Sequence, residues 1–599
     1  MADRERAKAQ RAVARSVEKG TRRSLEPFPC DAERPEGQTP ASAGGCADAA
    51  TADAYQCADD SSRQGVGLGP WGAVLFASEP AAALEVPPGA EPAGYAKVIV
   101  DYGLTVTPPH RLTFIGSRGG KTITERNGRT IVVLPPGYRP SPALTSQLAF
   151  ALKYDGVNLE VLAALFRRVD SEAFERELAG FLAAHPTSQY SRRIWFLYEF
   201  LTDRRLPIDD IQAALRYVPL LDEREYFTAP RAPSRRHRVI DNLLGTRAFC
   251  PMVRRTERLR DFEARSLGEE ARRIVAEFDE DAIRRAVSYL YSKETRSSFG
   301  IEGERLSTSR TERFVDLLRT VPELTSLTRE HLVRLQAATV DPRFAEDGYR
   351  NDQVYVAEPM DLVRQRIHFI APRPEDVPSM MEGLLACQRR LEGSQVDPVV
   401  HAAVVAFGFL FVHPFEDGNG RIHRLLIHYV LSRRGFTPKG IIFPVSAVML
   451  QRRREYDEAL EAFSVPLMRL IDYDESEDGV VSVRNETAHL YRYFDATPMA
   501  EALYRWVEQT VRKDFRCELE FVVGFRETRR AIDSVVDMPD RHANLFIKLC
   551  LQNNGRLSPA KRARHFAFLR DEEVAALEQA VQANLFRFPR AQGGDLDVK

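Results

Sequence analysis

The stretch HPFEDGNGRIHR, residues 413 to 424, interrupts one of the most apolar parts of the chain. Before it, VDPVVHAAVVAFGFLFV (396–412) is apolar nearly all round, which is typical of a helix buried on every side. Pro414 ends that helix, and from Arg421 the sequence resumes helical spacing until Gly435, a favourable residue for a helix end. The quoted stretch is therefore predicted to be a tight loop that joins two buried helices.

The glycines and arginines of this loop indicate an anion site. Gly418 and Gly420 allow backbone N–H groups to approach a ligand without obstruction by a Cβ, and the start of the second helix favours a phosphate. Arg421 and Arg424 are three residues apart, so they share one helix face and can reach successive phosphates as forked donors. The pattern predicts a cradle for a polyphosphate.

Two further residues of the loop suit catalysis on a phosphate. Asp417 offers a hard oxygen ligand for Mg²⁺, and His413 has an ordinary pKa near ~6.5, which suits a general base. Taken singly, a histidine before a proline is commonly a helix-capping or core residue, and Gly-Asn-Gly is commonly a turn. Found together within one loop, these residues predict a site of phosphoryl or nucleotidyl transfer.

The loop matches the pattern H-P-F-x-D-G-N-G-R-x-x-R at every specified position, so the chain resembles Fic-domain proteins. That resemblance implies a helical fold and transfer of AMP from ATP to a Ser, Thr or Tyr hydroxyl of a protein target. It implies that His413 deprotonates the hydroxyl, that Asp417 holds Mg²⁺ or Mn²⁺, and that Phe415 anchors the loop. The residues that would bind ATP by this resemblance are Gly418, Asn419, Gly420, Arg421 and Arg424.

The segment SFGIEG (298–303) resembles the inhibitory pattern S/T-x-x-x-E-G/N of the same family. On a helix, Ser298 and Glu302 fall on one face, with Gly303 next to them. By the resemblance, Glu302 would pair with Arg424 and occupy the arginine that the γ-phosphate needs. Six residues alone are a weak signal, because an exposed glutamate is the commoner case. Their place upstream of a full motif favours the inhibitory interpretation.

The segment GYRNDQVYVAEPMDLVRQRIHFIAP (348–372) resembles the family's flap, a hairpin whose free edge holds a target as an added strand. The alternative is an ordinary surface hairpin. The expected partners are therefore ATP, a protein target at 348–372, and the chain itself through auto-modification.

Composition limits the class of protein. The chain has 599 residues, 44% of them hydrophobic and 28% charged, as in globular proteins of several domains. A formal net charge of -1 gives no overall attraction to nucleic acid or membrane. The seven cysteines are scattered without a C-x-x-C pair, which suits a reducing compartment. With no signal-peptide pattern and no long apolar run, we expect a cytoplasmic protein without a membrane partner.

The chain is predicted to be mainly α, in four parts. Residues 1–85 are expected to be a flexible leader, because 31–69 carry few large apolar side chains. Residues 86–282 are expected to form an N-terminal α+β or helical domain, with a type I′ hairpin about Asn127-Gly128 and successive helices from 145 to about 290. A helical Fic domain with the inhibitory helix and the hairpin flap would span 283–475. A helical module, with a winged helix as an alternative, would span 476–599.

Two apparent motifs are set aside. IGSRGGKT (115–122) looks like a phosphate-binding P-loop, but Ile115 stands where glycine is required and the segment leads into a strand rather than a helix. His423 and His428 belong to no zinc-binding pattern and are expected to be core or rim residues.

The sequence of the C-terminal module does not decide whether it binds nucleic acid. Around NNGRLSP, helical spacing resumes at Ser558-Pro559, as in a winged-helix or helix-turn-helix module. The basic run KRARH (561–565) could contact nucleic acid, although such a run is more often a solvated helix face.

Three functions follow as hypotheses. The first is AMP transfer restrained by Glu302. The second keeps the fold and removes AMP, or transfers another phosphate-containing group; Gly420 argues against kinase activity, because phosphorylating relatives carry lysine there. The third, from another class, is a DNA-binding regulator whose helical core senses nucleotide.

Overall fold

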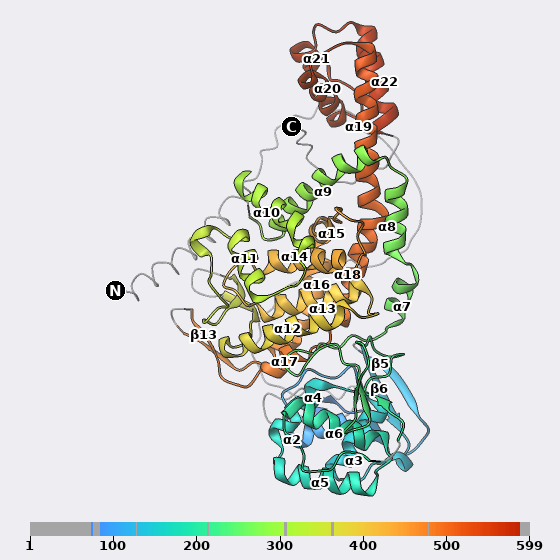
Figure 1. Ribbon diagram of the computed structural model, residues 1–599, viewed down its shortest axis with the longest axis vertical. Coiled ribbons are helices and arrows are strands. Elements are labelled where there is room, and N and C mark those ends of the chain that lie inside the picture. Colours follow the sequence, from blue (N-terminus) through green and yellow to red (C-terminus); the bar gives the residue numbers. More distant parts are fainter. Residues whose placement is uncertain are drawn as a thin grey trace, which may run out of the picture. The chain divides into compact units, whose positions relative to one another are not determined.

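The structure, a computed structural model, describes residues 74–75, 84–126, 128–212, 215–304, 308–360, 365–476 and 479–586. It is mainly α with several small sheets, which confirms the fold class expected from the sequence (Figure 1). Most of the expected leader, and Asn127 of the expected turn, lie outside the described residues.

The N-terminal part combines small sheets with four consecutive helices. Its elements are β1 (Val74–Leu75), β2 (Leu84–Glu85), β3 (Ala90–Pro92), α2 (Tyr95–Tyr102), β4 (Arg111–Gly116), β5 (Thr122–Arg126), β6 (Arg129–Leu134), η1 (Pro136–Tyr138), α3 (Leu144–Tyr154), α4 (Leu159–Arg168), α5 (Ser171–Ala184), α6 (Gln189–Thr202), β7 (Val218–Pro219), β8 (Ala232–Ser234) and β9 (Val239–Asp241). Strands β5 and β6 pair antiparallel from Arg126 opposite Arg129, with Gly128 at φ 72°, so the predicted hairpin is confirmed. No helix follows β4 before β5 in this described stretch, which agrees with the rejection of a P-loop at 115–122.

The expectation of successive helices from 145 to about 290 is wrong for residues 205–256. This segment holds the three-stranded sheet β7-β9-β8 and extended chain instead. Proline lacks the N–H that a helix needs and disfavours helical conformation in the residue before it. The prolines spread through this segment are Pro207, Pro219, Pro230, Pro233 and Pro251.

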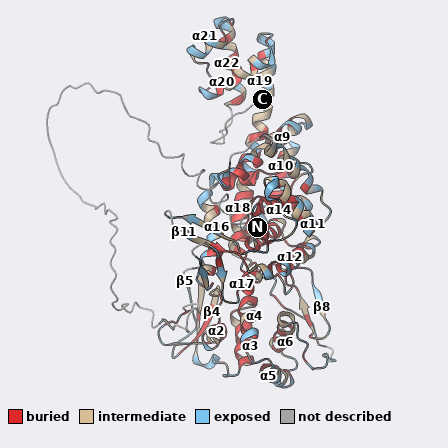
Figure 2. Cartoon of the chain, turned by 90° about the vertical axis from the view of Figure 1, so that its left-hand side faces the viewer, coloured by how far each residue is buried: buried red, intermediate tan, exposed pale blue. Residues whose placement is uncertain are grey.

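The central part is helical apart from one hairpin. Its elements are α7 (Glu257–Ala264), α8 (Leu267–Ala276), α9 (Glu280–Ile301), α10 (Thr308–Thr320), η2 (Val321–Glu323), α11 (Arg329–Thr339), η3 (Pro342–Phe344), β10 (Tyr355–Pro359), β11 (Gln365–Ile370), η4 (Pro374–Asp376), α12 (Val377–Glu392), α13 (Pro398–Val412), α14 (Asn419–Arg433), α15 (Val445–Gln451) and α16 (Arg453–Met468). Every residue of α13 from Val399 to Val412 is buried, because α12, α14 and α18 (Thr497–Gln509) pack around it. Most of α14 is buried too (Figure 2). The loop 413–418 thus joins two buried helices.

The C-terminal part adds β12 (Tyr473–Glu475), β13 (Val481–Val483), α17 (Ala488–Arg492), α18, the π-helical turn η5 (Thr510–Phe515), α19 (Arg516–Val535), α20 (Asp540–Gln552), α21 (Pro559–His565) and α22 (Asp571–Leu585). The described residues from 516 to 586 contain helices and no strand, so the wing of a winged helix is missing from them, whereas a helix-turn-helix arrangement agrees with α20 and α21. The larger hydrophobic clusters span 84–252 with Tyr493, 227–519, and 532–585. The domain boundaries stay predictions. Within the described ranges, each helix is too short or too polar to cross a membrane.

Candidate active site

His413 sits at a strained turn directly after α13. Its φ is 50°, in the left-handed region that a residue with a Cβ seldom adopts, and its N–H donates to the Phe409 carbonyl at 3.0 Å. The buried Arg350, from another segment of the chain, stabilises this turn. Its Nε donates to the His413 carbonyl at 2.7 Å and its backbone N–H donates to the Pro414 carbonyl at 2.9 Å. Backbone strain of this kind persists only where the surroundings enforce it.

One ring nitrogen of His413 is hydrogen-bonded within the protein, and the other can accept a proton. Nδ1 lies 3.1 Å from the Leu410 carbonyl oxygen, which can only accept, so Nδ1 carries the proton and Nε2 is the basic nitrogen. The pKa of His413 is lowered to about 4, mainly by burial and also by the charge of Arg350, against smaller opposing effects of the Leu410 bond and the Asp417 charge. At neutral pH the ring is therefore uncharged and able to accept a proton at Nε2.

The loop is closed by Asn419. Its Oδ1 accepts from the Phe415 N–H at 3.1 Å and its Nδ2 donates to the Phe415 carbonyl at 2.7 Å. Phe415 is fully buried, as the resemblance implies. Gly418 has φ 91°, and a Cβ there would lie 3.1 Å from Thr339 Oγ1. The Asn419 side chain thus holds the shape of the loop, and the Gly418 N–H donates to Asp417 Oδ1 at 2.5 Å.

The two arginines of α14 are buried and face the end of α9. Arg424 donates from Nε to Ser298 Oγ at 2.8 Å and from Nη2 to Glu302 Oε1 at 2.7 Å. Arg421 Nε forms an ion pair with Glu302 Oε2 at 2.9 Å, and its Nη1 donates to the Thr339 carbonyl at 2.8 Å. The exposed fraction of the side chain is 0% for Arg421, 2% for Arg424 and 25% for Glu302. One carboxylate therefore binds both arginines.

Glu302 also lies against the glycine cradle. It is the C-cap residue directly after α9, and Gly303 follows it at φ 70°. A Cβ on Gly420 would collide with Glu302 Oε1, so the carboxylate occupies the space that the missing side chain leaves free. The structure thus brings Ser298, Glu302 and Arg424 together, and it adds Arg421 to the pair that the sequence suggests.

Asp417 fits a metal ligand that shares its ion with a substrate. Its side chain is 54% exposed, and its Oδ1 accepts from Arg421 Nη2 at 2.7 Å. Within the described ranges, no three His, Cys, Asp or Glu side chains are grouped so as to hold a metal by themselves. Mg²⁺ commonly takes one or two carboxylates and completes its shell with phosphate oxygens and water. Asp417 alone suits that arrangement.

Sequence reasoning missed a supporting layer around the loop. Glu346 Oε1 accepts from the Glu416 N–H and from Gln336 Nε2, each at 3.0 Å. Burial raises the pKa of Glu346 to about 7, and the nearby Glu416 and Asp417 charges act in the same direction. Glu304 lies 3.3 Å from Arg421, just beyond the segment 298–303. These residues carry no local signal, apart from Glu304, which follows Gly303 directly.

The remaining candidates lie as follows. His423 is fully buried against Phe407, and His428 Nε2 is 2.8 Å from Glu294 Oε1 in the core, so the expected core position of both histidines is confirmed. Strands β10 and β11 pair antiparallel, and the Phe369 ring of β11 lies 6.3 Å from the His413 ring. The expected flap is thus a hairpin beside His413, although residues 361–364 lie outside the described part.

Part of the chain is similar in sequence to known proteins. Residues 326–431 match the model of the Fic/DOC family. The chain is 27% identical over 206 residues to "Protein adenylyltransferase Fic" of Nematostella vectensis (30% of this chain, 44% of that protein) and 24% identical over 207 residues to "Protein adenylyltransferase fic-1" of Caenorhabditis elegans (31% and 39%). The matches thus span less than half of those relatives' lengths.

Among solved structures, a Fic family protein from Desulfovibrio desulfuricans aligns with 18% identity and a TM-score of 0.31, covering 53% of this chain and 85% of that one. The family match contains the whole loop 413–424 and both arginines, whereas Ser298, Glu302 and Gly303 precede it. The chain therefore contains a domain of the Fic/DOC family.

Proposed function

We propose that this protein transfers AMP from ATP to a hydroxyl side chain of a protein target, and that Glu302 restrains the reaction. The observation that carries the proposal is the position of the Glu302 carboxylate, which binds Arg421 and Arg424 and fills the space beside Gly420. An anion is thus already bound where the loop suits phosphates. The names of the relatives support adenylyl transfer as the reaction.

The residues of the loop divide the chemistry among them. His413 Nε2 would take the proton of the target hydroxyl, whose oxygen then bonds to the α-phosphorus while the bond from that phosphorus to the pyrophosphate oxygen breaks. The amides of the glycine cradle and the guanidinium groups of Arg421 and Arg424 would stabilise the negative charge of the phosphates. Mg²⁺ or Mn²⁺, held by Asp417, would neutralise part of that charge when bound.

The restraint follows from competition for the same donors. While Glu302 binds both arginines, the γ-phosphate lacks its partners, so ATP binds weakly or with its α-phosphate turned away from the attacking hydroxyl. When ATP displaces the carboxylate, an arginine–carboxylate contact is exchanged for an arginine–phosphate contact. The free-energy difference between the two contacts sets the degree of inhibition.

Intact-mass measurement tests the proposal. The full chain is incubated with ATP and Mg²⁺, and a mass gain equal to AMP on the protein is expected for Glu302→Gly and not for Glu302→Gly combined with His413→Ala. Phosphate rather than AMP on the protein would replace the proposed reaction with a kinase reaction. If neither variant gains mass, a target protein is added before AMP transfer is rejected.

Removal of AMP is the second candidate, because Glu302 lies at the cradle with a carboxylate that could activate water. The test is release of AMP from an AMP-modified protein by the parent chain. Release that is lost in Glu302→Gly supports removal, whereas release that persists in that variant excludes this role of Glu302.

The third hypothesis, a nucleotide-sensing DNA-binding regulator, stays a prediction for the C-terminal module. Helix α21 carries the basic run 561–565 and buries none of its residues. A mobility-shift titration with duplex DNA at two salt concentrations tests it; salt-sensitive binding that is lost in Lys561→Ala with Arg564→Ala supports a DNA partner, and unchanged binding in that variant rejects α21 as the contact.

A further inference from the structure

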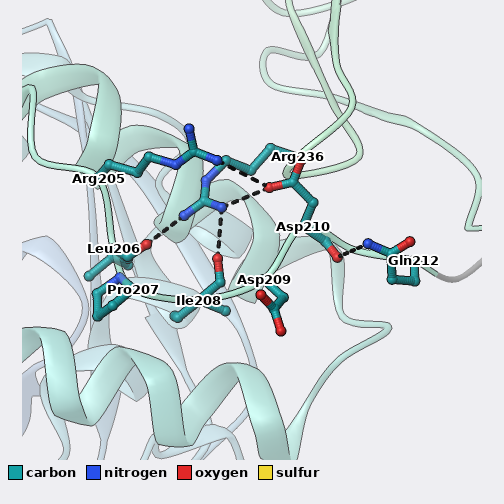
Figure 3. Close-up of a pocket in the computed structure, with 8 residues that line it drawn as sticks. All are labelled: Arg205, Leu206, Pro207, Ile208, Asp209, Asp210, Gln212 and Arg236. Carbon is teal, nitrogen blue, oxygen red and sulfur yellow. Dashed lines mark hydrogen bonds and ion pairs between the residues drawn. The ribbon is translucent and has the colours of Figure 1, made fainter.

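Among the cavities of the described residues that are lined by arginines, two differ in how the protein uses those arginines. In the first, Arg236 donates to the carbonyl oxygens of Leu206 and Ile208, both at 2.7 Å, and to Asp210 at 2.8 Å (Figure 3). Asp209 lines the same cavity. The Arg236 guanidinium is thus already bound by protein oxygens, and its role in the first cavity is structural.

The second cavity has a volume of about 420 Å³, within the usual range of about 300–1,000 Å³ for small-molecule sites. It lies between the N-terminal helices and the Fic-containing part of the chain. Ser171 at the start of α5, Thr202 at the end of α6 and Ser379 of α12 contribute hydroxyl groups. The aromatic residues Phe166 and Tyr493 also line it.

Four arginines line this second cavity, and none of its described lining residues is acidic. They are Arg167, Arg204, Arg247 and Arg492. Each has an acidic partner outside the lining: the ion pairs are Arg167 to Glu486 at 3.6 Å, Arg204 to Glu175 at 3.0 Å, Arg247 to Asp203 at 2.5 Å and Arg492 to Asp376 at 3.5 Å. Three of the arginine side chains are about half exposed, and exposed pairs are weak, so these guanidinium groups can turn to a ligand at little cost.

Buried polar atoms without partners mark the same cavity. Arg492 Nε and His489 Nδ1 are both buried and make no hydrogen bond within the described structure. His489 is only 5% exposed, and its Nε2 donates to the Thr105 carbonyl at 2.7 Å, so Nδ1 is left as an acceptor. Buried polar atoms are nearly always satisfied, so an unsatisfied donor and an unsatisfied acceptor on two residues of the lining favour a polar ligand here.

We propose that this cavity is a second ligand site, which binds a phosphate group, either as inorganic phosphate or as a compact phosphate monoester. A carboxylate offers two oxygens and one charge, whereas a phosphate monoester offers three terminal oxygens and up to two charges. A cavity lined by four arginines and, among its described lining residues, by no acidic side chain matches the phosphate better. The acceptor His489 Nδ1 suits a hydroxyl of the ligand, either the P–OH of a monoanion or one on the ester group.

Thermal shift and calorimetry with two named probes test this site, using the full chain. All proteins carry Arg424→Ala, so that phosphate binding at the catalytic cradle is weakened equally. Inorganic phosphate and phenyl phosphate are titrated into this background, into Arg167→Ala with Arg492→Ala, and into the control Arg205→Ala, which removes a 75%-exposed arginine of the first cavity. Because a ligand that binds only the folded state stabilises it, the background and the control should melt at higher temperature with probe.

The affinity of the Arg167→Ala, Arg492→Ala protein should fall by about tenfold or more, since each lost charge-assisted bond costs about a tenfold change. If that protein fails to fold, the half-exposed pair Arg204→Ala with Arg247→Ala replaces it with the same expectation. Tighter binding of phenyl phosphate would identify a monoester as the natural form, and tighter binding of inorganic phosphate would identify the free ion. Equal affinity in pocket variants and background overturns the proposal. An equal loss in Arg205→Ala also overturns it, because the attraction would then be one of general charge.

Discussion

Glu302 and Arg424 are joined by an ion pair of 2.7 Å, and the second oxygen of the same carboxylate lies 2.9 Å from Arg421. Glu302 caps the C-terminal end of α9 and both arginines lie in the first turns of α14, so Glu302 and Arg424 are 122 residues apart in sequence. Because the arginines are buried and the carboxylate is three-quarters covered, the contact is shielded from solvent and is stronger than a surface pair.

Replacing Glu302 by glycine should raise self-labelling with ATP by about an order of magnitude or more, where each tenfold corresponds to about 1.4 kcal/mol. The reason is that Arg421 and Arg424 become free for phosphates. The measurement is the initial rate of AMP incorporation at fixed ATP. Glu304→Gln is the matched control: of the two arginines that Glu302 binds, Glu304 contacts only Arg421, and its other carboxylate oxygen pairs with Arg310 at 2.8 Å, so this variant should give a smaller gain.

Adding Arg424→Ala to Glu302→Gly should cancel the gain, since the freed arginine is its cause. A Glu302→Gly protein no faster than the parent, with the double variant equal to both, would contradict the inhibitory role of SFGIEG.

His413→Ala should abolish AMP transfer and leave ATP binding nearly unchanged, because the ring takes a proton and contributes no phosphate contact in the proposed reaction. The pKa near 4 adds a pH prediction. A histidine with a lowered pKa is uncharged at every pH well above that value, so Nε2 is still unprotonated at pH 6 and can accept a proton there.

The rate of Glu302→Gly should therefore show no acid limb near the ordinary histidine pKa of about 6.5. The measurement is kcat/KM between about pH 5.5 and 8.5, which reports groups of the free enzyme. An acid limb centred near 6.5 that survives changes of buffer would show that His413 is more solvated than the structure indicates.

Much of the loop is predictable from sequence because its requirements are local. The apolar run of α13 and the pair Gly418 and Gly420 indicate two buried helices and a cradle. Helical spacing also puts Ser298 and Glu302 on one face. The contact of Glu302 with Arg421, in addition to Arg424, depends on how α9 meets α14, which spacing within one helix does not determine.

Other features were not predictable, for two physical reasons. Arg350 and Gln336 act on the loop across 63 and 81 residues, and a single arginine or glutamine in a sequence looks the same whether it is buried or solvated. Residues 205–256 contain apolar positions at helical spacing, but their prolines and short strand pairings prevail over that pattern.

Asp417→Ala, or excess EDTA, should remove AMP transfer, and Mn²⁺ should restore activity to the EDTA-treated protein. The physical reason is that Asp417 is an exposed carboxylate directly before Gly418 and can share a metal with the phosphates. The assay is AMP incorporation by Glu302→Gly. Asp417→Asn is the matched variant, because it keeps size and loses charge; transfer that persists in EDTA would rule out a metal at Asp417.

Arg350 is expected to position His413 without taking part in the reaction. It is buried, and its guanidinium donates to the carbonyl oxygens of His413 at 2.7 Å, Asp352 at 2.8 Å and Pro372 at 2.6 Å. Arg350→Lys keeps the charge but cannot fork to three acceptors. Each lost bond from a charged donor costs about 1.5–3 kcal/mol, so the melting temperature should fall.

The rate separates positioning from simple stabilisation. In the Glu302→Gly background and well below the melting temperature, Arg350→Lys should lower kcat by about tenfold or more, because His413 at φ 50° loses a bond that fixes its carbonyl, and a misplaced base transfers protons slowly. The KM for ATP should change little, since Arg350 contacts neither the glycines nor Arg421. Arg454→Ala, which removes a 91%-exposed arginine, is the control and should change neither quantity. An unchanged kcat in folded Arg350→Lys would limit Arg350 to stability and leave the turn at His413 to be held by its neighbours in α13.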